Sequence, residues 1–311
     1  MSHTIGVITN PTSGSGRGRR WGREALAALA ARGIKIRDLS HGSWSSAYEG
    51  AMKARRHLDA LVVVGGDGMV HLGAQICAEQ KYLPLGVIAA GSGNDAAYSY
   101  GLPLLDIEAA ADRIYEGLQG DITSVDVGKV TGHGVGEPGD PRYFTCVLSA
   151  GLDAAVAAYA RTITWPRGPI KYKFATFREV PRFHPYGVTV TADGKRWQGA
   201  CTLVAVANST VFGGGLIISP ESKINDGMFE LVTAEDISRA GVLKLFPKLK
   251  DGSHVKDPRI TITRVKEVTI AQTPDGAKLP AAFADGELVG AVPLHIQIAP
   301  RALRILGARI P

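Results

Sequence analysis

Two glycine-rich loops, each directly after a short apolar run, most constrain how this chain can fold. The first follows residues 61–64 and has the sequence Gly65-Gly66-Asp67-Gly68, and the second covers residues 90–95 after the run 85–89. Short apolar runs that end in glycine are typical of buried strands. Glycine loops let backbone N–H groups approach phosphate oxygens, and a carboxylate among them can address a metal ion. The pattern predicts two phosphate-binding loops on one edge of a parallel sheet.

The first 125 residues alternate between strand-like and helix-like segments. This is the pattern of a parallel sheet covered on both faces by helices. Strands are expected at residues 5–9, 34–39, 61–64 and 85–89, and helices at 21–32, 45–56, 107–118 and after each glycine loop. Gly33 is expected to terminate the first helix. We therefore predict an α/β N-terminal domain with a parallel sheet over residues 1–125.

The second part of the chain is strand-like, with turn signals between the segments. The clearest signal is Asp193-Gly194, which lies between residues 187–192 and 197–207 and is typical of a two-residue hairpin. Further strands are expected at 228–233, 260–263, 268–271, 281–284, 294–299 and 303–306, helices at 170–180 and 237–249, and a hairpin tip at 131–141. Residues 126–311 are thus predicted to form an all-β antiparallel sandwich, whose last strands can return to the first domain.

Composition narrows the class of protein. The chain has 311 residues, 45% hydrophobic and 21% charged, which is ordinary for a globular protein. It has neither a run of about 18 apolar residues nor a signal-peptide start, so we expect a cytoplasmic protein. Three distant cysteines, Cys77, Cys146 and Cys201, are expected to be core residues. The formal charge of +6 admits anionic partners. We expect no nucleic-acid partner, because proteins that bind single-stranded nucleic acid usually lack two phosphate-binding glycine loops.

Two common nucleotide fingerprints fit poorly. The segment before the first helix comes nearest to a Walker A loop, but it lacks the lysine. Gly91-x-Gly93-x-x-Ala96 follows a strand as the Rossmann fingerprint does. However, the acidic residue expected about 20 positions later is missing, because Asp112 falls in a helical pattern.

Six motifs occur in the order found in one known family. Besides the two loops, they are Asn10-Pro11-x-x-Gly14, Asp126-Val127-Gly128, Ser219-Pro220-x-x-Lys223-x-x-Asp226-Gly227-Met228 and Asp285-Gly286-Glu287. Over nearly its whole length the chain resembles the catalytic domain of the diacylglycerol kinase family, which also includes sphingosine-type lipid kinases. The resemblance implies an N-terminal domain of the NAD-kinase and diacylglycerol-kinase type. It also implies ATP as phosphoryl donor and diacylglycerol as acceptor, with phosphatidate as product.

The resemblance implies which residues contact ATP. The segment at the end of the first strand should line the nucleotide, Ser40 should reach a phosphate or the ribose, and the glycine loops should wrap the triphosphate. Asn94 should act through its amide and Asp95 by fixing its loop. The chain departs from the family at Met69, where threonine is usual, and at His71-Leu72, where Asn-Glu is usual. The full expected set is Asn10, Pro11, Thr12, Ser13, Gly14, Ser40, Gly66, Asp67, Gly68, Met69, Val70, His71, Leu72, Ser92, Asn94 and Asp95.

Mg²⁺ is the expected cofactor. Asp67 is the candidate to hold the catalytic ion, directly or through water, since Mg²⁺ prefers oxygen ligands and keeps waters. Asp126 is a candidate for a second ion held through water. The resemblance also implies a structural Mg²⁺ bound by the carboxylate of Asp226 and the backbone carbonyls of Lys223 and Met228. A simple turn at Asp226 is the alternative, and Ca²⁺ suits such a site equally well.

Asp285-Gly286-Glu287 is the candidate for receiving the proton of the acceptor hydroxyl. In a loose transition state this proton leaves late, so a positioned carboxylate is sufficient. The family places its proton acceptor within this triplet. We expect Glu287 to be the acceptor and Asp285 its partner, with the order of the two left open. The alternative is that Asp285-Gly286 forms only a two-residue hairpin turn.

A lipid substrate requires contact with a membrane surface. The cluster around Trp165, Lys171, Tyr172, Lys173 and Phe174 has the composition of an interfacial helix, and a core helix with solvated lysines is the alternative. We expect peripheral contact at the inner membrane face. The sequence leaves the oligomeric state open, a homodimer included. One alternative is a kinase of the same fold that acts on another acceptor, either a long-chain base or NAD. An alternative from another class is a non-catalytic protein that binds nucleotide or lipid.

Overall fold

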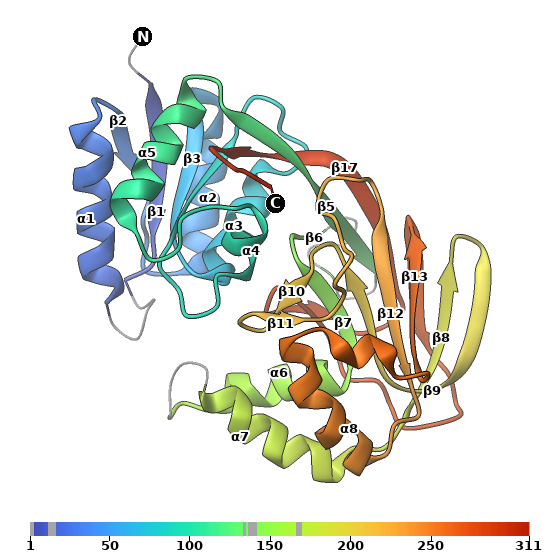
Figure 1. Cartoon of the computed structure of the whole chain (residues 1–311). Coiled ribbons are helices and arrows are strands. Elements are labelled where there is room, and N and C mark those ends of the chain that lie inside the picture. The colour runs from blue at the N-terminus through green and yellow to red at the C-terminus, as the bar shows by residue number, and fades with distance from the viewer. Residues whose placement is uncertain (1–2, 12–16, 133–134, 136–141, 166–169, 311) are drawn as a thin grey trace. The chain divides into compact units, whose positions relative to one another are not determined.

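The computed structural model describes residues 3–11, 17–132, 135, 142–165 and 170–310 (Figure 1). It divides into two compact units, which we describe separately. Unit 1 consists of Met1–Val127 and Arg301–Pro311, and unit 2 consists of Gly128–Pro300. Within the described residues, no helix combines the length and the apolar character needed to span a membrane.

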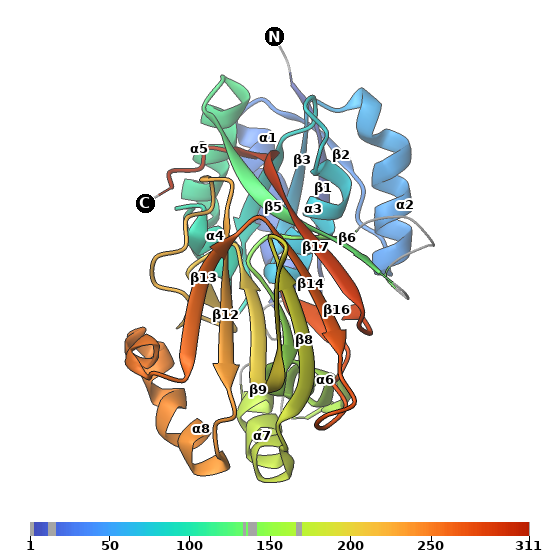
Figure 2. The same cartoon turned by 90° about the vertical axis from the view of Figure 1, so that its right-hand side faces the viewer.

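Unit 1 is built on a parallel sheet with the strand order β4-β3-β1-β2. The strands are β1 (Thr4–Thr9), β2 (Lys35–Asp38), β3 (Ala60–Gly65) and β4 (Leu85–Ala89), and the end of β17 (Leu294–Leu306) pairs in parallel with β4. The helices are α1 (Gly18–Ala31), α2 (Trp44–Ala54), α3 (Asp67–Cys77), α4 (Asp95–Ser99) and α5 (Ile107–Leu118), with a 3₁₀ turn, η2 (Arg55–His57), after α2. Helices α1 and α5 cover one face of the sheet and α2 and α3 the other (Figures 1 and 2). Strand β3 is buried along its whole length, as its apolar sequence predicts.

Unit 2 is an antiparallel β-sandwich, and its described residues include three α-helices. Its strands are β6 (Arg142–Phe144), β7 (Val147–Gly151), β8 (Tyr186–Ala192), β9 (Lys195–Ala207), β10 (Val211–Phe212), β11 (Leu216–Ile217), β12 (Phe229–Glu235), β13 (Ile260–Val265), β14 (Glu267–Gln272), β15 (Ala282–Ala284), β16 (Glu287–Gly290) and most of β17, and β5 (Ile122–Gly132) enters it from unit 1. The helices are α6 (Leu152–Thr162), α7 (Ile170–Glu179) and α8 (Arg239–Leu245), with 3₁₀ turns η3 (Val180–Arg182), η4 (Phe246–Lys250) and η5 (Ser253–Lys256). Phe144 stacks on Phe229 in its core, with 5.7 Å between the ring centroids.

The predicted fold class is confirmed, and several local predictions can be checked. The hairpin at Asp193-Gly194 is present, with Ala192 opposite Lys195, and all three cysteines are buried and unbridged. Strands β5 and β6 pair antiparallel on either side of the predicted hairpin tip, most of which lies outside the described residues.

Three predictions need correction. Helix α6 was not expected, because the segments around it are strand-like, although Leu152, Val156 and Tyr159 follow the i, i+4, i+7 spacing of one helix face. The two predicted C-terminal strands are one strand, β17, which bends at Arg301 with φ +51°. The predicted helix 237–249 is shorter: Ser238 caps α8 by accepting from Gly241 N, and Pro247, which has no N–H, lies in the following 3₁₀ turn.

Candidate active site

Three strand ends meet at one edge of the parallel sheet in unit 1. Thr9 is in register with Val64, and Gly65 with Ala89. Beyond the last pairs, Asn10 N donates to Val64 O at 3.2 Å and Ala90 N donates to Gly65 O at 2.8 Å. The loops that follow β1, β3 and β4 therefore start side by side, as the sequence predicts.

The two glycine loops touch through their backbones. A Cβ atom added to Gly91 would lie 2.3 Å from the Cα of Gly66, and one added to Gly66 would lie 3.0 Å from the Cα of Gly91. Neither contact can relax by moving a side chain. Gly91 thus requires glycine for packing, and a side chain at Gly66 would be tight against the same backbone, in addition to any contact with a phosphate.

Asp67 links the first loop to the second. Its Oδ2 accepts from the backbone N–H of Asn94 at 2.8 Å, and its Oδ1 accepts from that of Ala96 at 3.2 Å. These N–H groups begin α4, where an anion is favourable. Asp67 therefore fixes the second loop. Asp95, to which the sequence assigned that role, is buried at the first position of α4, and its role stays a prediction.

The side chain of Asn94 is engaged within its own loop. Its Oδ1 accepts from Gly91 N at 2.9 Å and its Nδ2 donates to Gly91 O at 3.1 Å. The backbone of Asn94 has a φ of +64°, which asparagine tolerates better than most residues. The expected contact of this amide with the nucleotide competes with these bonds and stays a prediction.

Met69 occupies the space over the first loop. It is buried in the first turn of α3, and a Cβ on Gly65 would lie 2.5 Å from its Cγ. Helical side chains point toward the helix N-terminus, which places Met69 back over the end of β3. The side chains of Val70, His71 and Leu72 are also buried, so they present little surface to a ligand.

The other expected ATP-binding residues lie around the same edge. Ser40 Oγ accepts from Thr9 N at 2.9 Å and shares a hydrogen bond with Thr9 Oγ1 at 3.0 Å, so it lies next to the loop after β1. Ser92 is exposed at the tip of the second loop, and Pro11 is exposed as well. The expected contacts at Thr12, Ser13 and Gly14 lie outside the described residues.

Asp126 supports the fold of unit 1. It is only 1% exposed, and its Oδ1 accepts from the backbone N–H of Arg301 at 2.7 Å, where β17 bends. A carboxylate in this position has little access to a hydrated ion. The expected role of Asp126 in a second metal site stays a prediction.

In unit 2, Asp285 and Gly286 form the turn between β15 and β16. Both have positive φ, +52° and +81°, as in a type I′ hairpin turn, and Ala284 pairs with Glu287 across it. The Asp285 carboxylate accepts from Thr145 N at 2.7 Å, Thr145 Oγ1 at 3.0 Å and Cys146 N at 2.8 Å. Asp285 thus anchors the turn to the connection between β6 and β7.

Glu287 is partly exposed, like Asp285. Its side chain is 39% exposed, and its Oε2 lies 2.6 Å from Arg161 Nη1 of α6. Asp285 and Glu287 therefore bind different partners. Which of the two receives a proton stays a prediction.

Helix α6 contains a buried carboxyl group that was not predicted from the sequence. Asp153 lies in its first turn, and its Oδ1 is buried with no hydrogen-bond partner among the described residues. Burial raises the pKa of this carboxyl group, and a hydrogen bond from Ser149 partly opposes the shift. Finding Asp153 from the sequence would have required predicting α6 itself.

The expected structural cation site lies in the loop before β12. Asp226 Oδ1 accepts from Met228 N at 3.1 Å, and Oδ2 contacts the guanidinium of Arg264. Lys223 is exposed. The carboxylate expected to bind the cation thus already has a cationic partner.

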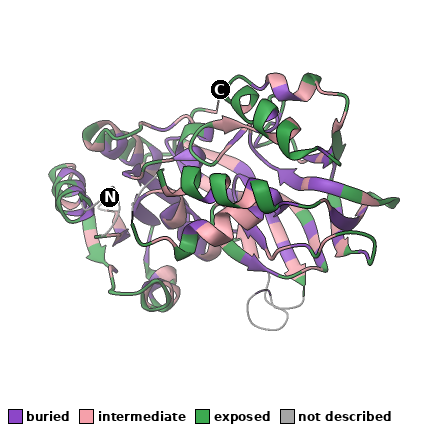
Figure 3. Cartoon of the chain, turned by 90° about the horizontal axis from the view of Figure 1, so that it is seen from below, coloured by how far each residue is buried: buried purple, intermediate pink, exposed green. Residues whose placement is uncertain are grey.

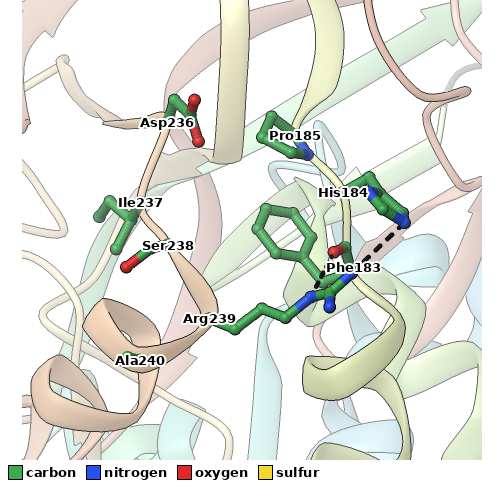
Figure 4. Close-up of a pocket in the computed structure, with 8 residues that line it drawn as sticks. All are labelled: Phe183, His184, Pro185, Asp236, Ile237, Ser238, Arg239 and Ala240. Atoms are coloured by element: carbon green, nitrogen blue, oxygen red, sulfur yellow. Dashed lines mark hydrogen bonds between the residues drawn. The ribbon is translucent and has the colours of Figure 1, made fainter.

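Unit 2 also has a hollow of about 420 Å³ that contains none of the predicted site residues (Figure 4). It lies between the segment before β8 and the start of α8. Arg239 reaches across it, donating from Nε to Phe183 O at 3.0 Å, with Nη2 3.3 Å from His184 Nε2. The hollow is lined by Phe183, His184, Pro185, Asp236, Ile237, Ser238, Arg239 and Ala240.

The fold and the paired glycine loops define the class of protein: an α/β unit followed by an antiparallel sandwich, as in diacylglycerol and NAD kinases. Residues 4–130 match the model of the diacylglycerol kinase catalytic domain, and residues 146–307 match that of the YegS C-terminal NAD kinase beta sandwich-like domain. A diacylglycerol kinase of Mycobacterium tuberculosis is 33% identical over 99% of this chain and 97% of its own. A diacylglycerol kinase of Bacillus subtilis is 27% identical over 85% and 84%. The chain belongs to the diacylglycerol kinase family.

Solved structures share the fold at low sequence identity. The crystal structure of a diacylglycerol kinase from Bacillus anthracis has a TM-score of 0.69 at 19% identity, covering 98% of this chain and 96% of that one. An NAD kinase from Archaeoglobus fulgidus in complex with ATP has a TM-score of 0.53 at 14% identity, with 97% and 93% covered. These likenesses concern the fold alone.

Proposed function

We propose that this lipid kinase transfers the γ-phosphoryl group of ATP to the free hydroxyl of diacylglycerol, giving phosphatidate. The observation that carries the proposal is the linked pair of glycine loops at one sheet edge in a chain of this family. Phosphoryl transfer depends mainly on positioning and on stabilising the charge of the transferred group. Backbone N–H groups of the two loops are suited to that task.

Mg²⁺ is part of this proposal, since it neutralises phosphate charge in such reactions. Asp67 would hold the ion through water. Its carboxylate oxygens accept the backbone N–H groups of Asn94 and Ala96, and a carboxylate can accept several hydrogen bonds, from water included. Glu287 is proposed to receive the proton of the acceptor hydroxyl, with Arg161 orienting it.

The test is a transfer assay with purified protein, radiolabelled ATP, Mg²⁺ and separate acceptors: diacylglycerol, a long-chain base and NAD. We expect labelled phosphatidate, and none after Glu287→Gln. Label on the long-chain base or NAD alone would overturn the substrate. ATP binding by calorimetry without any labelled product would show a non-catalytic member.

We further propose that the kinase works from the cytoplasmic side, where ATP is available, and meets its lipid through α7. The apolar residues Ile170, Phe174 and Phe177 follow the i, i+4, i+7 spacing of one helix face and are 52%, 55% and 75% exposed. The opposite face is buried at Ala175, and Arg178 lies 3.9 Å over the Tyr159 ring of α6. A core helix, the alternative weighed from sequence, would bury the apolar face instead.

The surroundings of α7 favour a lipid surface as its partner. Trp165 is 84% exposed, and Lys171 and Lys173 lie among the apolar residues. Figure 3 shows long exposed stretches on the helices seen from below. Aromatic side chains with interspersed lysines suit the boundary of an anionic bilayer.

Vesicle sedimentation tests this surface. Burial of one phenylalanine side chain is worth about 1.5–3 kcal/mol, so a Phe174→Ser, Phe177→Ser variant should bind phosphatidylglycerol vesicles at least tenfold more weakly. Trp197→Ser, at an exposed aromatic of β9, is the control and should bind normally. Equal binding by both variants would rule out α7 as the docking element.

A further inference from the structure

The site that the family resemblance gives to a structural cation is built differently in this chain. In the loop of residues 219–228, Asp226 is followed by Gly227, which has a φ of +74°. The Asp226 side chain turns back so that Oδ1 accepts from Met228 N at 3.1 Å. Its second oxygen contacts Nη2 of Arg264, which lies on β13.

Arg264 also faces a second carboxylate. Glu230 and Arg264 are directly opposite each other in the ladder between β12 and β13, and Arg264 Nε lies 3.6 Å from Glu230 Oε1. The side chains are 4% exposed at Glu230, 23% at Asp226 and 57% at Arg264. One guanidinium therefore lies between a loop carboxylate and a buried strand carboxylate.

At this site a guanidinium can hold two carboxylates together, as a divalent ion would. It carries a permanent positive charge and presents several N–H donors in a fixed plane, so it can bind two carboxylates at once. A divalent ion on the same Asp226 oxygen would lie next to this positive charge and be repelled by it. Arginine and cation thus compete for this carboxylate.

We propose that Arg264 replaces the structural cation: its guanidinium joins Asp226 to Glu230 and ties the loop of residues 219–228 to the β12–β13 hairpin. The fold of unit 2 then needs no divalent ion at Lys223, Asp226 and Met228. The proposal is independent of the substrate of the kinase.

Thermal unfolding of the full chain, without nucleotide, tests the proposal. The wild type should melt at the same temperature in EDTA, in millimolar Mg²⁺ and in millimolar Ca²⁺. Arg264→Gln should melt several degrees lower in EDTA and should regain part of the loss on adding either ion, because two carboxylates are then left for the cation. Arg264→Lys, which keeps a positive charge, should lose less and respond less to the ions.

Arg259→Gln is the matched control, since Arg259 pairs with Asp257 in the same unit at 2.8 Å, away from the loop. It should show no response to either ion. A wild type that EDTA destabilises and Mg²⁺ or Ca²⁺ restores would overturn the proposal. So would an Arg264→Gln variant that melts like the wild type under all three conditions. If Arg264→Gln does not fold, the wild-type comparison and Arg264→Lys still decide the question.

Discussion

Asp67 is the residue on which the candidate nucleotide site depends most. Removing its carboxylate leaves the N–H groups of Asn94 and Ala96 without their acceptor, and hydrogen bonds to charged groups are worth about 1.5–3 kcal/mol each. Asp67→Ala should therefore lower the free energy of unfolding by about 2–4 kcal/mol and abolish phosphoryl transfer. Denaturant unfolding and the radiolabel assay measure the two effects.

Asp106→Ala provides the control for that change. Asp106 caps α5 in the same unit by accepting from Ala109 N at 3.0 Å, so its loss should cost about 1 kcal/mol without affecting transfer. An Asp67→Ala enzyme with the wild-type rate would remove Asp67 from the proposed site.

Asp153 gives a prediction about pH. Because burial raises the folded-state pKa of its carboxyl group, the folded chain holds this proton more tightly than the unfolded chain. Stability therefore falls as pH rises from the unfolded-state pKa through the raised folded-state pKa. Asp153→Asn, which cannot ionise, should be more stable than the wild type at pH 7.5, because it buries no charge at this position. The difference should vanish at acidic pH, and melting curves across pH test it; a difference independent of pH would contradict this account.

At the scale of elements, the contact between the two glycine loops sets the spacing of the loops that follow β3 and β4. Gly91→Ala forces a Cβ to within 2.3 Å of the Gly66 backbone, so the loops must separate. We expect a loss of about 1–3 kcal/mol in stability and a higher KM for ATP. Gly42→Ala, with nothing within 4 Å of the added Cβ, should leave both unchanged. An unchanged KM in Gly91→Ala would show that loop spacing does not matter for ATP.

Some features of these elements could be predicted from the sequence, and others could not. The glycine loops and the hairpin at Asp193-Gly194 were predictable, because backbone conformation at these positions depends on local residue type. The partners of Asp67 and Asp285 were not, because Asn94 and Thr145 come from other segments that only tertiary packing brings near. Arg264 was missed for the same reason, since it meets Asp226 only through the pairing of β12 with β13.

At the scale of the whole molecule, the first unit is completed by the end of the chain. Ile305 pairs with Leu85 of β4, Gly307 N donates to Asp121 O at 2.8 Å, and Arg309 N donates to Tyr100 O at 2.9 Å. Leu306 is 1% exposed and belongs to the core under α1 and α5. We therefore expect the unit that carries the nucleotide loops to need the last strand of the chain in order to fold.

This dependence predicts that a change near the C-terminus weakens the N-terminal unit. Leu306→Ala should lower the free energy of unfolding by about 2–5 kcal/mol, because it removes a buried side chain from a packed core. Hydrogen exchange should show the lost protection in β4 and α5, and ATP binding should weaken with it. Leu288→Ala, at a leucine that is 50% exposed, is the control and should change little. Normal protection of β4 and α5 in Leu306→Ala would mean that the unit folds without its last strand, and deletion of residues 301–311 would then leave ATP binding intact.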